Sequence, residues 1–275
     1  MTNSQADTET RFLTRPGGRI AYDVTGSGPL VVCVPGMGEL RATYRFLAPA
    51  LVEAGFRVAT MDLRGHGESD VTFDQYDDVA LESDIRALID ELGGPATLIG
   101  SSMGAAAGVL VAVDHPDAVR ALVLTGPFVR DVPQPRSQEL MMRAAMAGPW
   151  ARRVWLAYYP KFYPGERPAD FGQYCTTIDR SLRGKGKTRA FSRTTRSSHA
   201  QTDKVLDSVR QPTLVVMGSA DPDFPDPTAE AHVIARRTHG SAHVVDGAGH
   251  YPHVQRPDEV NPVVIEFLRA LPADA

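Results

Sequence analysis

The sequence predicts an α/β fold in which a mostly parallel central sheet carries helices on both faces and a helical cap insertion interrupts the alternation. Short apolar runs of strand length alternate with longer segments of helical pattern. This alternation stops near residue 128 and resumes near residue 212. A glycine-flanked serine also stands between an apolar run and a run of small, helix-compatible residues. Alternating strands and helices are typical of parallel sheets, whose crossover helices cover both faces.

In chain order, the apolar runs predict strands at residues 19–22, 30–34, 57–61, 97–99, 121–124, 214–217 and 243–245. The intervening segments predict helices at residues 44–54, 79–92, 105–114, 227–238 and 257–269. We therefore expect a core domain in two parts, at residues 11–127 and 210–272, after a flexible N-terminus of residues 1–10. Residues 128–209 are expected to form a helical cap or lid over the site, because lids fold over the ends of such sheets.

The candidate nucleophile is Ser102, in the pentapeptide Gly100-Ser101-Ser102-Met103-Gly104. The apolar run 96–99 precedes it and the small-residue run 105–110 follows, which predicts a strand, a sharp turn and a helix. Such a turn holds its central serine in a strained conformation with the hydroxyl projecting, and the flanking glycines avoid Cβ clashes. A solvent-exposed Gly/Ser turn is the alternative, since this short pattern also arises by chance.

A nucleophilic serine needs a histidine to accept its proton and a carboxylate to orient that histidine. In the strand-turn-helix version of this chemistry, the carboxylate and then the histidine follow the serine in the chain. Asp221 lies just beyond the expected strand 214–217, and His250 lies in the loop after the expected strand 243–245. Ser102, Asp221 and His250 therefore form the predicted catalytic triad.

Taken together and in order, five segments resemble the α/β-hydrolase superfamily, in its branch of cap-containing serine hydrolases, and the resemblance spans about residues 20 to 270. The segments are Val34-Pro35-Gly36-Met37-Gly38, Asp62-Leu63-Arg64-Gly65-His66-Gly67-Glu68-Ser69, Gly100 to Gly104, Gly218-Ser219-Ala220-Asp221 and Gly247-Ala248-Gly249-His250.

The resemblance implies that the backbone N–H groups of Met37 and Met103 form the oxyanion hole. The family usually has His-Gly where this chain has Pro35-Gly36, which leaves open how that loop is braced.

Other residues compete for these roles. Asp223 and Asp226 share the loop of Asp221, and in some relatives the acid follows the preceding strand, which would point to Asp131; the Gly-x-x-Asp-x-x-x-Pro spacing favours Asp221. Four further histidines are expected to play other parts: His66 in a structural turn, His253 in packing, His115 at a helix end, and His199 on the surface or at the pocket.

Composition fits this interpretation. The chain has 275 residues, a formal charge of −4 and only two cysteines, Cys33 and Cys175, which do not make a disulfide framework. The N-terminus lacks the features of a signal peptide, and no apolar run approaches the roughly 20 residues of a membrane span. We therefore expect a cytoplasmic protein with no membrane partner and no nucleic-acid partner, acting on a small-molecule acyl substrate. The sequence leaves its oligomeric state open.

No cofactor and no metal are expected. Gly36-Met37-Gly38 has Arg41 where a dinucleotide fingerprint needs glycine, and Gly186-Lys187-Thr188 has Ser181 where a phosphate loop needs it. Cysteine and histidine do not cluster at metal-binding spacing.

The charge of the chain is unevenly distributed. Residues 128–209 contain 15 Lys and Arg against 7 Asp and Glu, a balance of +8, while the remainder of the chain has a balance of −12. Such an asymmetry attracts anionic substrates or an acidic partner in some proteins, but an ordinary solvated helical surface is the favoured explanation.

The sequence thus indicates a cofactor-independent serine hydrolase that cleaves a carboxylic ester, lactone or thioester through an acyl-enzyme. Alternatives within the superfamily are a C–C bond hydrolase and a cofactor-free perhydrolase. A ligand-binding receptor that retains the triad is the alternative of another class.

Overall fold

The computed structural model describes residues 9–131 and 136–272. The expected flexible N-terminus therefore lies, except for its last two residues, outside the described residues. Eight strands of the described part form one sheet in the order β1-β2-β4-β3-β5-β6-β7-β8. Their bounds are β1 Arg11–Arg15, β2 Gly18–Thr25, β3 Leu30–Val34, β4 Arg57–Met61, β5 Ala96–Ser101, β6 Val119–Thr125, β7 Thr213–Gly218 and β8 Ser241–Val245.

The sheet is parallel from β4 to β8, and only β1 and β2 pair antiparallel with their neighbours. The prediction of a mostly parallel sheet is confirmed. The sequence did not predict β1, because only Leu13 of this edge strand is buried and its apolar pattern is correspondingly weak. β1 joins β2 through a tight turn at Gly17, whose φ of +90° favours glycine.

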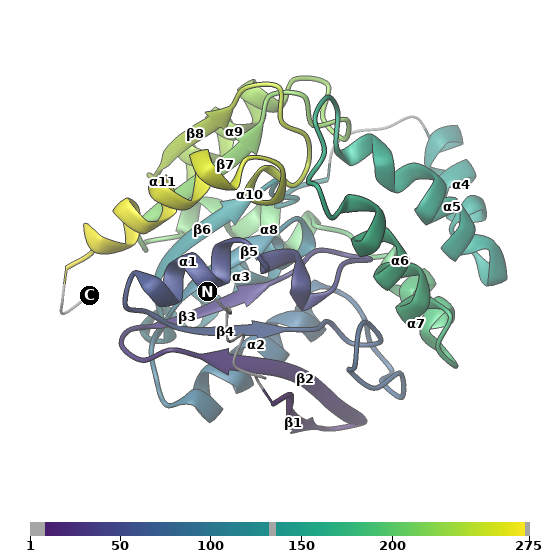
Figure 1. Ribbon diagram of the computed structural model, residues 1–275, viewed down its shortest axis with the longest axis horizontal. Coiled ribbons are helices and arrows are strands. Elements are labelled where there is room, and N and C mark those ends of the chain that lie inside the picture. Colours follow the sequence, from purple (N-terminus) through teal and green to yellow (C-terminus); the bar gives the residue numbers. More distant parts are fainter. Residues whose placement is uncertain (1–8, 132–135, 273–275) are drawn as a thin grey trace.

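Helices cover both faces of the sheet (Figure 1). One face packs against α2 (Asp78–Leu92), α3 (Met103–Asp114) and α9 (Pro227–Arg237), and the other against α1 (Leu47–Glu53) and α11 (Pro257–Arg269). Successive side chains of a strand point to opposite faces of the sheet, so each buried strand contributes to both layers. In β3, Val32 and Val34 pack in the first layer, and Val31 and Cys33 pack in the second. The helix predicted at 44–54 is shorter in the structure, where α1 begins at Leu47, and a short 3-10 helix, η1 (Arg41–Tyr44), precedes it.

The segment between β6 and β7 is helical. It contains α4 (Arg136–Ala145), η3 (Gly148–Trp150), α5 (Ala151–Tyr158), η4 (Tyr159–Phe162), α6 (Phe171–Leu182), α7 (Lys187–Thr194), α8 (Ala200–Val205) and η5 (Leu206–Ser208). Helices α4 to α7 gather beyond one end of the sheet, at the right of Figure 1. Helix α8 lies instead against α3, where the Thr202 hydroxyl donates a hydrogen bond to the Ala106 carbonyl across 3.5 Å.

An aromatic cluster joins these helices to the core. Trp155, Tyr159 and Phe162 pack with Tyr251, which lies between β8 and the short helix α10 (Pro252–Gln255). The backbone N–H of His250 also donates to the Phe162 carbonyl across 3.0 Å. The loop that carries His250 is therefore fixed directly against η4.

Candidate active site

Ser102 lies at the sharp turn between β5 and α3. Its φ of 54° and ψ of −119° are rare for a residue with a side chain, and such strain persists only where neighbouring structure enforces it. The backbone supplies that enforcement, because the Ser102 N–H donates to the Thr125 carbonyl across 3.0 Å. The turn is therefore anchored to the end of the neighbouring strand β6.

Close packing around the turn requires glycine at several positions. A Cβ at Gly104 would lie 2.3 Å from the Val34 carbonyl oxygen, and a Cβ at Gly100 would lie 2.5 Å from the Gly104 carbonyl oxygen. A Cβ at Gly36 would approach the Ser102 Cβ to 2.7 Å. The loop after β3 thus lies directly against Ser102, with no room for a larger residue between them.

His250 and Asp221 meet beyond the ends of β7 and β8. The Nδ1 atom of His250 lies 2.7 Å from Oδ2 of Asp221, and both side chains are buried. Burial disfavours charge on the imidazole, but Asp221, Asp223 and Glu39 outweigh it and raise the pKa of His250 to about 9. His250 and Asp221 therefore form a buried, closely hydrogen-bonded pair.

The segment directly after β6 lies against both Ser102 and His250. A Cβ at Gly126 would lie 3.3 Å from the His250 Nδ1 atom, and the Phe128 N–H donates to the Ser102 carbonyl across 3.4 Å. The Phe128 ring is 5.6 Å from the His250 ring. The Ser102 hydroxyl makes no hydrogen bond with His250 in the described part of the chain, but both residues contact this same segment.

The two backbone groups expected in the oxyanion hole come from different elements. Met103 is the first residue of α3, so its N–H has no partner within the helix. Met37 lies in the loop after β3, and no hydrogen bond from its N–H is found within the described residues. Both amides are thus available as donors, next to Ser102 and next to Gly36 respectively.

The three other carboxylates considered for the acid role each have hydrogen-bond partners other than His250. Asp223 Oδ2 is 3.9 Å from His250 Nδ1, and this residue accepts a hydrogen bond from the Tyr158 hydroxyl at 2.9 Å. Asp226 caps α9 by accepting from the Ala229 N–H at 2.9 Å. Asp131 accepts from the Ser198 hydroxyl at 2.7 Å and from the His199 N–H at 2.8 Å.

The remaining candidate histidines are dispersed. His115 lies 3.1 Å from a Glu82 carboxylate oxygen, and His199 lies 2.6 Å from one of Asp78. His253 is fully buried and stacks on Tyr44 with a ring separation of 5.2 Å. His66 is buried in the turn 62–69, where its Nε2 accepts a hydrogen bond from the Gly38 N–H at 3.1 Å. His66 therefore supports the loop after β3, in which Pro35 stands where the family usually has histidine.

Aromatic residues of the insertion form one wall of this region. The Phe162 ring lies 5.0 Å from the His250 ring, and Trp155 is so close to Gly38 that a Cβ there would approach the indole to 2.5 Å. The buried carboxyl group of Glu39 accepts a hydrogen bond from the Tyr174 hydroxyl at 2.6 Å, and burial raises its pKa. Sequence reasoning missed Glu39, whose only signal is its position directly after the Gly36-Met37-Gly38 loop.

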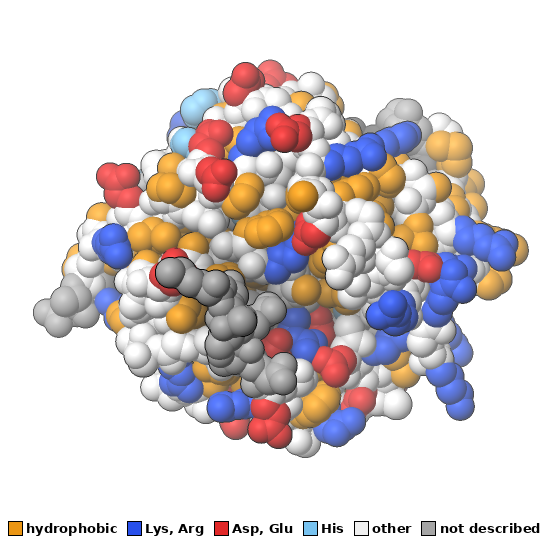
Figure 2. All heavy atoms as spheres, in the orientation of Figure 1, with side chains coloured by type: hydrophobic (Ala, Val, Ile, Leu, Met, Phe, Trp, Pro, Cys, Tyr) orange, Lys and Arg blue, Asp and Glu red, His pale blue; other side chains and the backbone are white. Residues whose placement is uncertain are grey.

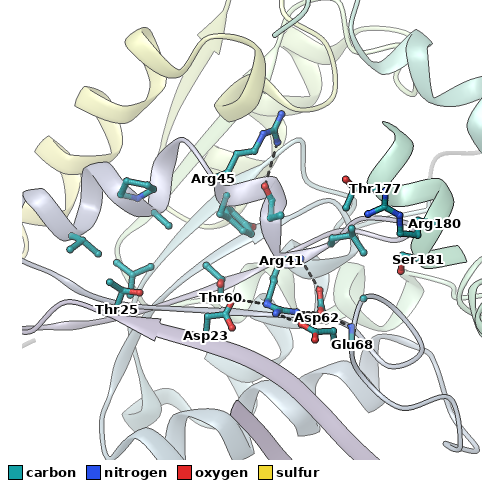
Figure 3. Close-up of a pocket in the computed structure, with 18 of the residues that line it drawn as sticks. Asp23, Thr25, Arg41, Arg45, Thr60, Asp62, Glu68, Thr177, Arg180 and Ser181 are labelled. Atoms are coloured by element: carbon teal, nitrogen blue, oxygen red, sulfur yellow. Dashed lines mark hydrogen bonds and ion pairs between the residues drawn. The ribbon is translucent and has the colours of Figure 1, made fainter. Parts of the chain in front are cut away.

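A separate hollow of about 790 Å³ lies between η1, α1, the strands β2 and β4, and α6 (Figure 3). At its polar end, Arg41 donates to Asp23 at 2.6 Å and also pairs with Asp62 and Glu68. Asp62 accepts from the backbone N–H groups of Arg41 and Glu68 at 2.8 and 3.0 Å. This network, also missed from the sequence, fixes the turn that carries His66 and is distinct from the Ser102 region.

One group of side chains in the described part has the spacing of a metal site. Asp221, Asp223 and His250 have ligand atoms within 4.8 Å of one another. The hydrogen bond between Asp221 and His250 accounts for this spacing, since it uses the Nδ1 atom that a metal would need.

Among the described residues, no helix has the length and apolar character needed to cross a membrane.

Comparison with known proteins places these features in context. Residues 31–263 match the Alpha/beta hydrolase family. A bifunctional epoxide hydrolase 2 of Sus scrofa is 35% identical over 136 residues, which cover 47% of this chain and only 24% of that enzyme. A putative 2-succinyl-6-hydroxy-2,4-cyclohexadiene-1-carboxylate synthase of Bacillus subtilis is 27% identical over 92% of this chain and 96% of its own length.

The fold is also similar to solved structures. An esterase from Exiguobacterium antarcticum superposes with a TM-score of 0.81 at 20% identity, covering 93% of this chain and 97% of the esterase. At this identity the similarity concerns the fold, and the arrangement around Ser102 has to be interpreted from its own geometry.

Proposed function

Because the chain belongs to the alpha/beta hydrolase family, we propose that it is a serine hydrolase that cleaves a carboxylic ester, lactone or thioester. The observation that carries the proposal is the buried His250–Asp221 pair, with its 2.7 Å hydrogen bond, beside the strained turn of Ser102. A strained serine next to an oriented imidazole is the arrangement that acyl transfer requires.

In the proposed mechanism, Nε2 of His250 takes the proton of the Ser102 hydroxyl as the oxygen attacks the substrate carbonyl. Asp221 holds Nδ1–H, which selects the tautomer whose Nε2 is free, and stabilises the imidazolium that forms. The hydrogen bond between serine and histidine is often long in free enzymes and tightens in the substrate complex. In this proposal, substrate binding draws the Ser102 hydroxyl toward His250.

The negative oxygen of the tetrahedral intermediate would accept hydrogen bonds from the amides of Met37 and Met103. Met103 adds the positive end of the α3 dipole, because it begins that helix. His250 then returns its proton to the leaving group, and a water molecule repeats the sequence on the acyl-enzyme. Helices α4 to α7 would act as a cap, with Phe162 and Trp155 excluding water from the acyl group.

The epoxide hydrolase match does not carry that activity to this chain. Relatives that open epoxides or remove halides have aspartate at the nucleophile position, and this chain has Ser102. The fold and the matched segment are thus compatible with a hydrolase whose first step is acyl transfer to serine.

The test is an activity screen with p-nitrophenyl esters of graded chain length, lactones and acyl thioesters, with Ser102→Ala as the blank. We expect steady multiple turnover of at least one class, abolished in the blank. A single stoichiometric burst that leaves a stable adduct would instead indicate a ligand-binding receptor that has kept the triad. Turnover that persists undiminished in Ser102→Ala would overturn the proposal.

A further inference from the structure

The outer surface of the insertion exposes a group of large apolar side chains. Leu140, Met141 and Met142 of α4 are 70, 65 and 50% exposed, and Trp150 of η3 is 56% exposed. We call these four residues the apolar ridge. Elsewhere in the described part of the chain, the only other exposed large hydrophobic side chains are Phe12 and Val79, at 41 and 45%. An exposed apolar cluster of this kind usually marks a binding surface.

A basic cleft adjoins the apolar ridge. It has a volume of about 760 Å³ and no aspartate or glutamate in its lining. Its charged lining consists of Arg183, Lys185, Arg189, Arg193 and Arg196. Five positive charges around one hollow create a strongly positive potential, which favours an anionic ligand.

The cations of the cleft are only partly neutralised by the protein. Arg183 pairs with Asp179 at 2.8 Å, and Arg193 donates to the Phe73 carbonyl at 3.2 Å. The other three, Lys185, Arg189 and Arg196, are exposed and have no carboxylate partner within the described residues. Arg189 and Arg193 are four residues apart on α7, so their side chains share one face of the helix, and Arg196 lies in the turn that follows it. Their mutual repulsion is relieved when an anion binds.

The ridge and the cleft form one continuous surface. Pro149, which lines the cleft, directly precedes Trp150, and the Ser192 hydroxyl of the cleft donates to the Met146 carbonyl at 2.7 Å. Figure 2 shows Lys and Arg side chains mixed with hydrophobic ones along the right-hand edge, over the insertion helices. Acidic side chains are sparse on that part of the view.

We propose that this surface docks on an anionic lipid bilayer. The apolar ridge would enter the boundary between headgroups and acyl chains, where tryptophan and aliphatic side chains are stable. The cations of the basic cleft would bind the lipid phosphates at the same time. Such peripheral docking needs no membrane-spanning helix, so the proposal departs from the sequence-based expectation of no membrane partner, which rested on the absence of a long apolar run.

The charge distribution favours a planar anionic surface over a small anion or a nucleic acid. Residues 128–209 carry a balance of +8 and the remainder of the chain −12. A negative surface therefore attracts the insertion and repels the core, which orients the whole molecule with this face toward the surface. A small anion or a nucleic-acid backbone would satisfy the cleft but leave the apolar ridge in water.

The test uses the full chain and vesicle flotation. Vesicles of phosphatidylcholine mixed with phosphatidylglycerol should carry the protein, and this binding should weaken as salt rises. Vesicles of phosphatidylcholine alone should carry little of it. The fluorescence of Trp150 should shift to shorter wavelength on binding, and Trp150→Phe should abolish this shift. Equal binding to both vesicles, or to neither, would overturn the proposal.

Paired variants separate the two parts of the surface. Arg189→Glu with Arg196→Glu, and separately Leu140→Ser with Met141→Ser, should each weaken vesicle binding at least tenfold. Arg236→Glu with Arg269→Glu makes the same charge change on exposed positions of α9 and α11 and should have a much smaller effect. Unchanged thermal melting shows that each variant is folded. An equal loss in the control pair would overturn the proposal, because it would mean that only net charge matters.

Other occupants of the surface give different results. Concentration-dependent dimers that dissociate in the Leu140→Ser and Met141→Ser variant, without vesicle binding, would assign the ridge to a second copy and overturn the proposal. Binding of inorganic phosphate without vesicle binding would reduce the cleft to a small-anion site and overturn it as well. Vesicle binding is measured directly and does not depend on the reaction proposed at Ser102.

Discussion

The backbone N–H of Gly38 donates a hydrogen bond to Nε2 of His66 across 3.1 Å. An amide can only donate, so Nε2 must be the unprotonated nitrogen, and Nδ1 carries the proton toward the Arg64 carbonyl 2.9 Å away. Burial lowers the pKa of His66 to about 4, which keeps the ring neutral near pH 7 and its lone pair available. The imidazole thus braces the loop of Met37 from a turn more than twenty residues away in the chain.

This contact predicts a positioning role for His66. His66→Ala should lower kcat about tenfold to a hundredfold with little change in KM, because the Met37 amide would lose its fixed position relative to the oxyanion. His66→Gln should restore part of the loss, since its amide oxygen can accept from Gly38. Steady-state kinetics on a good ester substrate measure both.

The control for this prediction is His115→Gln, at a partly exposed histidine far from the loop. It should leave both constants unchanged. A folded His66→Ala protein with normal kcat would show that the loop keeps its position without the imidazole.

The second prediction concerns the nucleophile. A fluorophosphonate probe should label Ser102, and Ser102→Ala should lose labelling together with several orders of magnitude of turnover. Ser101 is fully buried and its Oγ has no hydrogen-bond partner, so it lies beyond the reach of the probe. Ser101→Ala is the matched control, and peptide mapping by mass spectrometry gives the labelled position. Labelling that survives in Ser102→Ala would refute the assignment.

The third prediction concerns the acid. Asp221→Asn should reduce turnover on the order of 10⁴-fold, because the amide would leave the imidazole in the wrong tautomer. Asp223→Asn should cost far less, since Asp223 Oδ2 is 3.9 Å from Nδ1 and its Oδ1 accepts a hydrogen bond from the Tyr158 hydroxyl. Asp226→Asn should keep full turnover, because asparagine can still cap α9. If Asp223→Asn proves the crippling change, the roles in this loop must be reassigned.

The fourth prediction follows from the raised pKa of His250. The residue must be neutral to act as a base, so kcat/KM should rise with pH through the neutral range and level off above the pKa of about 9. Asp221→Asn removes the largest cause that raises the pKa of His250. The midpoint of the pH profile should therefore move to lower pH, and the plateau value of kcat/KM should fall. Profiles over about pH 6 to about pH 10 provide the measurement. If the midpoint of the pH profile is the same in Asp221→Asn, the pH dependence does not come from the titration of His250 beside Asp221.

Much of the fold and the site could be predicted from the sequence because their signals are local. The strands β3 and β4 and the helix α11 have the expected bounds, since apolar runs and flanking prolines define them within the chain. Ser102, Asp221 and His250 each follow a strand, so their positions could be predicted from the strand ends together with the glycine-flanked serine pattern and the order of the triad in the chain. Their catalytic roles remain predictions that the variants above test.

The rest depends on contacts between distant segments. The acceptor role of His66 follows from a hydrogen bond across 28 residues, and the Arg41 network joins positions in four separate segments, including β2 and the turn 62–69. The edge strand β1 gains its place from pairing with β2 rather than from its own composition. Such pairings leave no pattern within a short stretch of sequence.

The last prediction concerns His253 and acid stability. Burial lowers the pKa of His253 to about 3, and neither ring nitrogen has a partner within the described residues. The ring is therefore neutral in the folded state, whereas the unfolded chain takes up a proton near the ordinary pKa of about 6.5. Above about pH 6.5 the ring is neutral in both states, and proton binding at this position takes nothing from the free energy of unfolding. As the pH falls from about 6.5 toward 3, only the unfolded chain gains this proton, so the free energy of unfolding decreases progressively.

His253→Phe should remove this loss. Phenylalanine keeps the stacking on Tyr44 and buries no unpaired nitrogen, so the free energy of unfolding near pH 7 should change by less than about 1.5 kcal/mol. Near pH 5 the variant should melt at a higher temperature than the parent, because its unfolded state no longer gains a proton at this position. Thermal melting across this range measures the difference, with His115→Gln as the exposed-histidine control. A variant that is markedly destabilised near pH 7 would mean that the ring nitrogens are hydrogen-bonded in solution, and the stability of the fold would then rest partly on a polar contact at this position.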